Sequence, residues 1–293
     1  MEDRKMNIQW FPGHMAKAQR EISEHMRFVD VVCEIIDARI PRSSRNPDIA
    51  KLSGEKPRLV ILNRADLADP SVTKLWSAYF KEQGTPVLET DCKSGRGVSE
   101  FSTAARAVLA QKLSDRAAKG QASRPIRAMV LGVPNVGKST FINKAAKRKA
   151  AKASDRPGVT RGRQWVTVDA GMELLDTPGI LWPKLDSPEI GLVLAFTGAI
   201  RDATLDIEEL GARLMLRLAE DYPQGVESRY GIESKPGGEI EYGVELLEMA
   251  AKRRGFLVRG GEPDIERMAT IFLDEFRDGR LGRISLEKPE VID

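Results

Sequence analysis

Long apolar runs are missing from this sequence of 293 residues. The longest uncharged apolar stretch, Ile190 to Ile200, has eleven residues, whereas a membrane-spanning helix needs roughly 20. The first five residues, MEDRK, are mostly charged, and no apolar core follows them, so we expect no signal peptide. Both absences argue against a membrane partner.

Cysteine and histidine are also scarce, with two residues of each. Cys33 and Cys92 cannot build a disulfide framework, and no Cys/His cluster has the spacing of metal ligands. A reducing cytoplasm is therefore the compartment that we expect. The composition, 41% hydrophobic and 30% charged, is that of a globular chain with one large domain or two ordinary ones.

An excess of charge of one sign is missing from the chain as a whole, because 46 Lys and Arg face 43 Asp and Glu, a net charge of +3. The two parts of the chain differ, however. Residues 1–185 hold 32 basic and 20 acidic side chains (+12), and residues 186–293 hold 14 and 23 (−9). A positive first part favours a polyanionic partner, although ordinary surface charge would also give such a split.

Two patterns divide the chain, and they predict two domains, 1–185 and 186–293. In the first, apolar runs alternate with amphipathic helical patterns, which predicts an α/β fold with a mostly parallel sheet and helices on both faces. We expect strands at 29–36, 58–62, 86–89, 126–131, 164–168 and 173–175, and helices at 16–27, 71–83, 98–112 and 138–147. The polar stretch 114–124 is predicted to be a linker. The second domain shows only helical periodicity beyond residue 202, which predicts an all-α bundle.

A phosphate-binding loop is the strongest motif. Residues 132–139, GVPNVGKS, match G-x-x-x-x-G-K-[ST] between an apolar strand and a helical pattern. We expect Lys138 to reach the β- and γ-phosphates and the Ser139 hydroxyl to bind Mg²⁺. The residues predicted to surround the phosphates are Asn135, Val136, Gly137, Lys138, Ser139 and Thr140.

Two further segments resemble nucleotide switches. Residues 176–179, Asp-Thr-Pro-Gly, end an apolar run, so Asp176 is predicted to hold Mg²⁺ through water and Gly179 to offer its N–H to the γ-phosphate. Thr160 lies in a glycine-flanked segment between the two motifs and is predicted to close on Mg²⁺. This order and spacing indicate a switch GTPase rather than a generic ATPase.

A guanine-binding motif stands in an unusual place. Asn143 is the last asparagine, so an Asn-Lys-x-Asp motif cannot follow residue 179, but Asn63-Arg64-Ala65-Asp66 follows the apolar run 59–62. Asp66 would accept from guanine N1 and N2, Asn63 would brace the loop, and Arg64, in place of lysine, would cover the face of the base. Taken alone, the segment would be read as a turn that ends a strand. Residues 89–95 would form the loop that contacts guanine O6.

The motif order is a circular permutation of the usual GTPase order, with the stretch 114–124 joining the former chain ends. Together with WFPGHMAK at 10–17, DARIP at 37–41 and LGRI at 281–284, the motifs resemble the ribosome biogenesis GTPase A family. The resemblance implies a permuted P-loop GTPase that binds GTP, GDP and Mg²⁺ and acts in late assembly of the large (50S) ribosomal subunit in the bacterial cytoplasm.

GTP hydrolysis is expected to depend on a group outside the usual switch position. Ile180 and Leu181 stand where many GTPases have a water-orienting glutamine, so intrinsic turnover should be slow and activated by a partner. We hypothesise that His14 swings toward the γ-phosphate and positions water; packing or capping at the start of a helix is the alternative. Asn135 is a candidate for holding K⁺, and a loop-bracing hydrogen bond is the alternative.

The expected partner is a large-subunit precursor, with its rRNA and ribosomal proteins. Residues 138–163 hold nine basic side chains and one acid beside the switch segment, a pattern that favours RNA phosphates over a plain solvated face. The clusters 252–254 and Arg277, Arg280 and Arg283 could dock the bundle on rRNA or a ribosomal protein, or be ordinary solvated arginines. We expect a monomer with no DNA partner. A GTP-dependent RNA-binding module and another nucleotide-switch enzyme, such as a tRNA-modification GTPase, are the alternative functions.

Overall fold

The computed structural model describes residues 13–121, 124–146, 165–182, 185 and 187–290. The chain divides into two compact units. The sheet unit comprises the described residues up to 185 together with 285–290, and the helical unit comprises residues 187–284. Each unit has its own core and is described by itself.

A six-stranded sheet forms the centre of the sheet unit, in the order β3-β2-β1-β4-β6-β5. All neighbours are parallel except β5, which runs antiparallel to β6. The prediction of a mostly parallel sheet is therefore confirmed. The strands are β1 (Val31–Asp37), β2 (Arg58–Asn63), β3 (Val87–Glu89), β4 (Ile126–Leu131), β5 (Trp165–Asp169) and β6 (Met172–Leu175).

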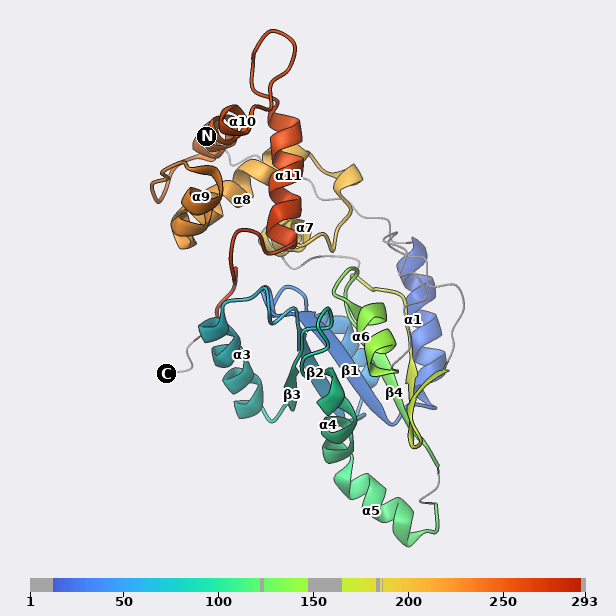
Figure 1. Ribbon diagram of the computed structural model, residues 1–293. Coiled ribbons are helices and arrows are strands. Elements are labelled where there is room, and N and C mark those ends of the chain that lie inside the picture. The colour runs from blue at the N-terminus through green and yellow to red at the C-terminus, as the bar shows by residue number, and fades with distance from the viewer. Residues whose placement is uncertain (1–12, 122–123, 147–164, 183–184, 186, 291–293) are drawn as a thin grey trace. The chain divides into compact units, whose positions relative to one another are not determined.

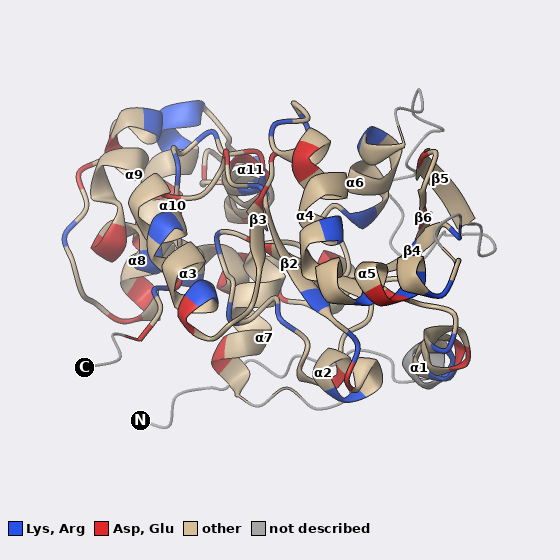
Figure 2. Ribbon diagram, turned by 90° about the horizontal axis from the view of Figure 1, so that it is seen from below, with Lys and Arg blue, Asp and Glu red and all other residues tan. Residues whose placement is uncertain are grey.

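Helices cover both faces of this sheet, as predicted (Figure 2). The helices are α1 (Gly13–Met26), α2 (Pro47–Ser53), α3 (Pro70–Glu82), η1 (Val98–Glu100), α4 (Phe101–Val108), α5 (Ala110–Ala118) and α6 (Lys138–Ala145). On one face, α1 and α2 pack with Val32 and Met129, and α3 packs with Ile36 and Val60. Helices α4 and α6 lie together on the other face, where the Phe101 and Phe141 rings meet edge to face at 5.0 Å.

The stretch 114–124, predicted to be a linker, is partly helical, because α5 continues to Ala118. Its side chains have a buried target: Arg116 pairs with Asp30, and Lys112 Nζ lies 3.2 Å from the same carboxylate. The polar composition therefore reflects an anchored helix rather than an extended connection. Helix α2 was not predicted, because seven residues are too few to show a period, although Asn46 caps it.

The sheet order shows the circular permutation. β4, which leads into the P-loop (residues 132–139), lies inside the sheet although it is fourth in the chain. The three earlier strands lie on one side of it and the two later strands on the other. Helices α4 and α5 occupy the connection from β3 to β4, where the former chain ends would have been joined.

The helical unit contains five α-helices among its described residues (Figure 1). They are α7 (Pro188–Phe196), α8 (Ile207–Asp221), α9 (Pro223–Tyr230), α10 (Ile240–Arg254) and α11 (Ile265–Arg277), with a short 3-10 turn at Asp202–Thr204. α8 packs closely on α10 and α11: a Cβ on Gly243 would lie 2.4 Å from Ala212 O, and one on Gly211 would lie 2.7 Å from Ala269 Cβ. The apolar positions that recur at helical spacing in α8, α10 and α11 are mostly buried, whereas Ile207 and Ile265 are half-buried and Met249 is 43% exposed.

The end of the chain returns to the sheet unit, contrary to the expectation that the helical domain would run to residue 293. Leu286 N donates to Arg39 O at 2.8 Å, and Trp76 Nε1 donates to Glu287 O at 3.0 Å. The Glu287 carboxylate accepts from Arg42 N at 2.7 Å. These polar contacts hold the tail, and helical periodicity could not reveal them. Within the described residues, no helix is long and apolar enough to cross a bilayer.

Candidate functional site

The P-loop follows β4 and leads into α6. Gly132 has φ 155°, and a Cβ there would lie 2.4 Å from Ile35 O. Gly137 has φ 99°, and a Cβ there would lie 2.4 Å from Asn63 Nδ2. Only glycine fits both positions, so the loop can turn tightly and present the free N–H groups at the start of α6 to an anion.

Lys138 is buried inside this loop, with 7% of the residue exposed. Its Nζ donates to Gly132 O at 3.2 Å and to Val133 O at 2.7 Å. Burial lowers the pKa of Lys138 to about 8, against the opposing effect of the Asp176 carboxylate. The ammonium group is thus held inside the loop by two of the loop's own backbone carbonyl groups.

Asp176 and Ser139 face each other beside this lysine. Ser139 Oγ donates to Asp176 Oδ2 at 3.2 Å. Asp176 Oδ1 is buried and has no hydrogen-bond partner in the described part of the chain. Burial raises the pKa of Asp176, although Lys138 opposes the rise. An open carboxylate oxygen next to a hydroxyl is a donor set that suits Mg²⁺, which binds oxygen ligands and usually keeps water and phosphate in its shell.

The Asp-Thr-Pro-Gly segment, residues 176–179, runs directly against the P-loop. A Cβ on Gly179 would lie 2.6 Å from Pro134 Cα and 3.0 Å from Lys138 Nζ, so only glycine allows this approach. Ile180 N donates to Gly132 O at 3.2 Å. The Ile180 and Leu181 side chains are buried, so apolar groups occupy the positions after Gly179.

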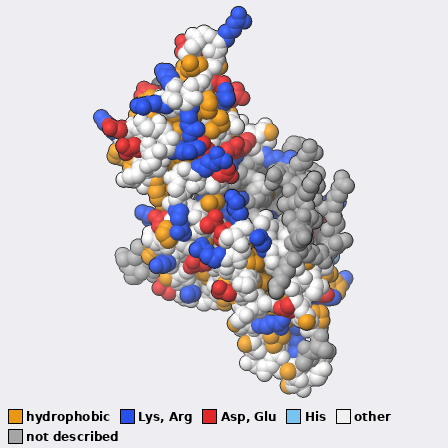
Figure 3. Space-filling model, in the orientation of Figure 1, with side chains coloured by type: hydrophobic (Ala, Val, Ile, Leu, Met, Phe, Trp, Pro, Cys, Tyr) orange, Lys and Arg blue, Asp and Glu red, His pale blue; other side chains and the backbone are white. Residues whose placement is uncertain are grey.

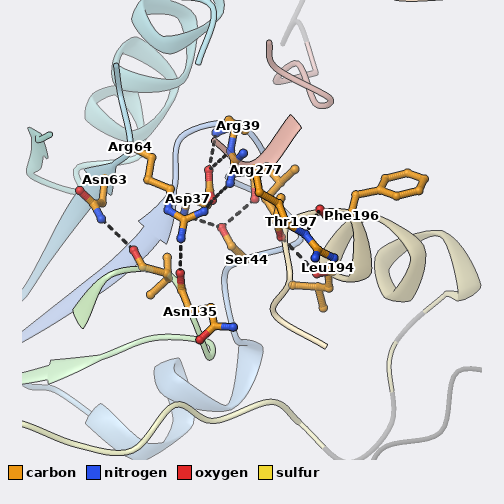
Figure 4. A network of polar contacts seen from close by, with 12 residues as sticks. Asp37, Arg39, Ser44, Asn63, Arg64, Asn135, Leu194, Phe196, Thr197 and Arg277 are labelled. Carbon is orange, nitrogen blue, oxygen red and sulfur yellow. Dashed lines mark hydrogen bonds and ion pairs between the residues drawn. The ribbon is translucent and has the colours of Figure 1, made fainter. Parts of the chain in front are cut away.

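Asn63 connects three loops. Its Nδ2 donates to Val136 O of the P-loop at 2.8 Å. Its Oδ1 accepts from Thr90 Oγ1 and from Cys92 N, each at 3.2 Å. The guanine loop (residues 63–66), the P-loop and the segment 89–95 therefore share one bridging amide. Figure 4 shows the contact that the Asn63 side chain makes toward the P-loop.

Arg64 reaches back to the P-loop in this structure. It has φ 59°, and its Nη2 donates to Asn135 O at 2.6 Å while Nη1 lies 3.5 Å from Asp37 Oδ2. The predicted cover over a base remains a prediction. Burial opposes the charge of Asp37, but the Arg39 guanidinium and its hydrogen bonds keep the pKa of Asp37 below its ordinary value. Asp37 belongs to the DARIP segment that carries the family resemblance, and its position at the end of the buried strand β1 is the sequence signal for a role at this site.

Asp66 is half-buried beside the segment 89–95. Ala65 N donates to Thr90 O at 3.1 Å, which joins the two loops. Burial raises the pKa of the Cys92 thiol to about 12, and the nearby charges of Asp91 and Asp66 contribute. Asp66 makes no hydrogen bond or ion pair with the described residues, so its carboxylate is open to a ligand.

The remaining predicted residues are placed only in part. Thr160 and most of the basic run, residues 147–163, lie outside the described residues. His14 lies at the start of α1, but its side chain is outside the description. Thr140 lies exposed in the first turn of α6, and Asn135 is exposed with φ 57°.

Comparisons with known proteins agree with this geometry. A family model described as 50S ribosome-binding GTPase matches residues 127–221. Ribosome biogenesis GTPase A of Bacillus cereus is 46% identical over 97% of this chain and 95% of that protein. The Thermotoga maritima protein of the same name is 35% identical over 97% and 96%.

Two solved structures match nearly the whole chain. They are a GDP-bound form of YlqF, with a TM-score of 0.64 over 92% of this chain and 100% of that one, and GNP-bound YlqF from T. maritima, with 0.63 over 94% and 99%. Each is 32% identical to this chain.

Sheet order, P-loop and the family match define a circularly permuted P-loop GTPase. The chain belongs to the ribosome biogenesis GTPase A family, which confirms the resemblance seen in its motifs.

Proposed function

We propose that this GTPase acts in late assembly of the 50S ribosomal subunit, in the bacterial cytoplasm and as a monomer. In its GTP form it binds the precursor particle, and after hydrolysis it leaves. The observation that carries the proposal is the similarity to ribosome biogenesis GTPase A along 97% of the chain. The complete set of P-loop, switch and guanine motifs supports it.

The residues of the site have distinct roles in this proposal. When nucleotide binds, the Lys138 ammonium group exchanges its hydrogen bonds to Gly132 O and Val133 O for contacts with the β- and γ-phosphates. Asp66 accepts hydrogen bonds from the N–H groups of guanine. Ser139 and Asp176, joined by Thr160 from the switch segment, would hold Mg²⁺, which neutralises phosphate charge when bound. The Gly179 N–H would read the γ-phosphate, so the segment 176–179 senses which nucleotide is present.

Water activation requires a group from elsewhere. Because Ile180 and Leu181 are buried and apolar, neither can orient a water molecule. Intrinsic turnover is therefore slow, and the ribosomal particle activates it by bringing His14 to the γ-phosphate. His14→Ala should abolish particle-stimulated GTP turnover. His25→Ala is the matched control, because His25 bonds to Glu21 O within α1. Equal stimulation of the two variants would contradict a catalytic His14.

Asn135 is proposed to help hold K⁺ beside the phosphates. Its carbonyl group accepts from Arg64, while its side chain is on an exposed loop residue. Turnover should be faster in K⁺ than in Na⁺ at equal ionic strength. Equal rates would assign Asn135 to bracing the loop.

RNA is the proposed component of the particle that this protein contacts. On the face in Figure 3, basic and acidic side chains intermix on both units. The densest basic segment is residues 138–163, next to the nucleotide site in the sequence. RNA phosphates would release counterions on binding there, so particle binding should weaken steeply with added salt.

Sedimentation with ribosomal particles tests the proposal. The protein is mixed with immature large-subunit particles, mature subunits or small subunits, together with GDP or a non-hydrolysable GTP analogue. We expect cosedimentation with immature large-subunit particles and the analogue, and weaker binding with GDP. Binding to small subunits alone, or to no particle, would overturn the proposed function.

The second candidate function is a GTP-dependent RNA-binding module, in which GTP binding without hydrolysis is sufficient. The buried apolar side chains of Ile180 and Leu181 favour it. A variant that binds GTP without hydrolysing it distinguishes the two. If that variant still supports completion of the subunit, GTP binding alone does the work.

A further inference from the structure

The sheet unit has a cavity that shares no lining residue with the nucleotide site described above. It has a volume of about 370 Å³ and lies among β1, the segment 41–47, α2 and α3. We propose that it binds one unpaired nucleotide, with the base's exocyclic amino group donating to Glu34. The proposal rests on the proposed function, because single-stranded rRNA would be the source of that nucleotide.

Glu34 is the polar centre of this cavity. Its side chain is 2% exposed, and its Oε2 accepts from Arg45 Nε at 3.3 Å. Its Oε1 is buried and has no hydrogen-bond partner among the described residues. A buried acceptor without a donor is costly, so a ligand N–H that reached Oε1 would recover that cost.

The fold places Glu34 between two apolar cores. Val32 and Ile36 flank it on the same face of β1, one packed with α1 and α2 and the other with α3. Burial raises the pKa of Glu34, against the charges of Arg45 and Arg58.

The walls of the cavity suit a flat ring. Tyr79 and Phe80 of α3 contact edge to face, with ring centroids 5.6 Å apart. Phe80 itself is buried, with Trp76 stacked against its ring at 5.7 Å and the Arg45 guanidinium over it at 5.3 Å. The half-buried Tyr79 ring and the Arg45 guanidinium are therefore the flat groups of the lining on which a base can stack. Pro41 and Pro47 also line the cavity. Aromatic and apolar walls of this kind stack against nucleobases without regard to their sequence.

The charges of the lining favour a nucleotide over a basic protein side chain. Three arginines, Arg42, Arg45 and Arg58, line the cavity with one carboxylate. Arg42 pairs with Glu290 at 2.9 Å and Arg45 with Glu34 at 3.3 Å, so the positive excess is the charge of Arg58. The Arg58 side chain makes no hydrogen bond or ion pair with the described residues, although its charge acts on Glu34. A lysine or arginine from a partner would meet this positive excess, whereas the phosphate of a nucleotide would be attracted to it.

Glu34 also predicts which base is preferred. A glutamate oxygen accepts from the amino group of cytosine, and uracil has a carbonyl oxygen at the same position. Two acceptors that face each other gain no hydrogen bond, so cytosine should bind better than uracil.

Binding of short oligonucleotides to the full-length, GDP-saturated protein tests this inference. Labelled tetracytidylate, tetrauridylate and free CMP are compared by fluorescence anisotropy, competition and calorimetry at one salt concentration. We expect tetracytidylate to bind about tenfold more tightly than tetrauridylate. Binding of CMP would show that a free nucleotide suffices, and binding of the oligonucleotide alone would identify RNA as the source.

Variants locate the effect in the cavity. Glu34→Gln should remove the preference for cytosine, because an amide can either accept or donate. Arg58→Gln should weaken both oligonucleotides by a similar factor. Lys51→Gln is the matched control, because Lys51 lies on α2 with its side chain 83% exposed and does not line the cavity. Unchanged GDP binding shows that each variant is folded. If Glu34→Gln does not fold, Tyr79→Ala replaces it and should weaken both oligonucleotides.

Two results would overturn the inference: equal binding of both oligonucleotides with no effect of the variants, or binding of an arginine-rich peptide at this cavity instead. The proposed function fails separately. If the protein cosediments with large-subunit particles but shows no base preference, only the inference falls. If base preference and its loss in Glu34→Gln are observed without particle binding, only the role in assembly falls.

Discussion

Buried charges are arranged differently in the two units. In the helical unit, Glu275 is 4% exposed and accepts from Tyr230 Oη at 2.6 Å, from Arg229 and from Arg254. The Arg229 hydrogen bond, with those partners, lowers the pKa of Glu275 to about 2. In the sheet unit, Asp176 is left with one unpartnered oxygen, and burial raises its pKa.

The difference separates stability from function. Glu275 ties α9, α10 and α11 together with every bond made inside the unit, so it stabilises the fold. Lys138 and Asp176 are buried at a cost that internal partners do not fully offset, and a ligand would supply what is missing. Replacing a fully partnered buried charge such as Glu275 should lower the stability of the fold. Replacing an incompletely partnered one such as Lys138 should lower GTPase activity.

Lys138→Met should give the largest effect. We expect a loss of about 10³-fold in kcat/KM for GTP, because one preorganised charge at the phosphates is removed. The midpoint of thermal unfolding without nucleotide should stay the same or rise, since a buried ammonium group is gone. Lys74→Met, at an exposed position of α3, is the control. A large loss of stability would break the distinction between the two kinds of buried charge.

Glu275→Ala should have the opposite pattern. We expect a loss of about 3 kcal/mol in the free energy of unfolding, at the low end for a broken buried pair, because Arg229 and Arg254 can still reach water. Urea denaturation followed by circular dichroism measures it, with Glu220→Ala on α8 as control. GDP affinity should not change. The wild-type contribution is present above pH 4.5 and is lost as the pH falls toward 2, because the pKa of Glu275 is lower in the folded state.

Asp66→Asn tests whether the half-buried Asp66 carboxylate, which has no hydrogen-bond partner among the described residues, binds the guanine base. Adenine cannot donate from N1, and an asparagine loses the charged pair with guanine, so preference for GTP over ATP should fall about 30-fold. Competition between GTP and ATP for the protein measures this. An unchanged preference would mean that Asp66 is not the residue that reads guanine.

The sequence was sufficient where local patterns carry the information. The P-loop glycines and the apolar strands 58–62 and 126–131 predicted the sheet, because backbone geometry and burial are both local properties. It was insufficient where a partner lies far along the chain. Arg116 reaches Asp30 across 86 positions, and Glu287 reaches Ser43 across 244. No periodicity records such pairs, so the sequence predicts a linker where the second half of α5 lies and places the tail in the helical domain.

The pH dependence of nucleotide binding gives the smallest effect and tests the comparison most directly. Because the pKa of Lys138 is about 8 in the nucleotide-free protein, the side chain is charged below that pH and loses its proton above it. Phosphates favour the charged form, so binding above pH 8 must take up a proton. GDP affinity should therefore be flat below pH 8 and fall by up to about tenfold per unit above it. Titration calorimetry at pH 7 and 9, in buffers with different ionisation heats, counts the protons directly. Proton uptake at pH 9 but not at pH 7 would show that Lys138 becomes fully charged only when the phosphates bind. No uptake at either pH would mean that Lys138 is already fully charged in the nucleotide-free protein.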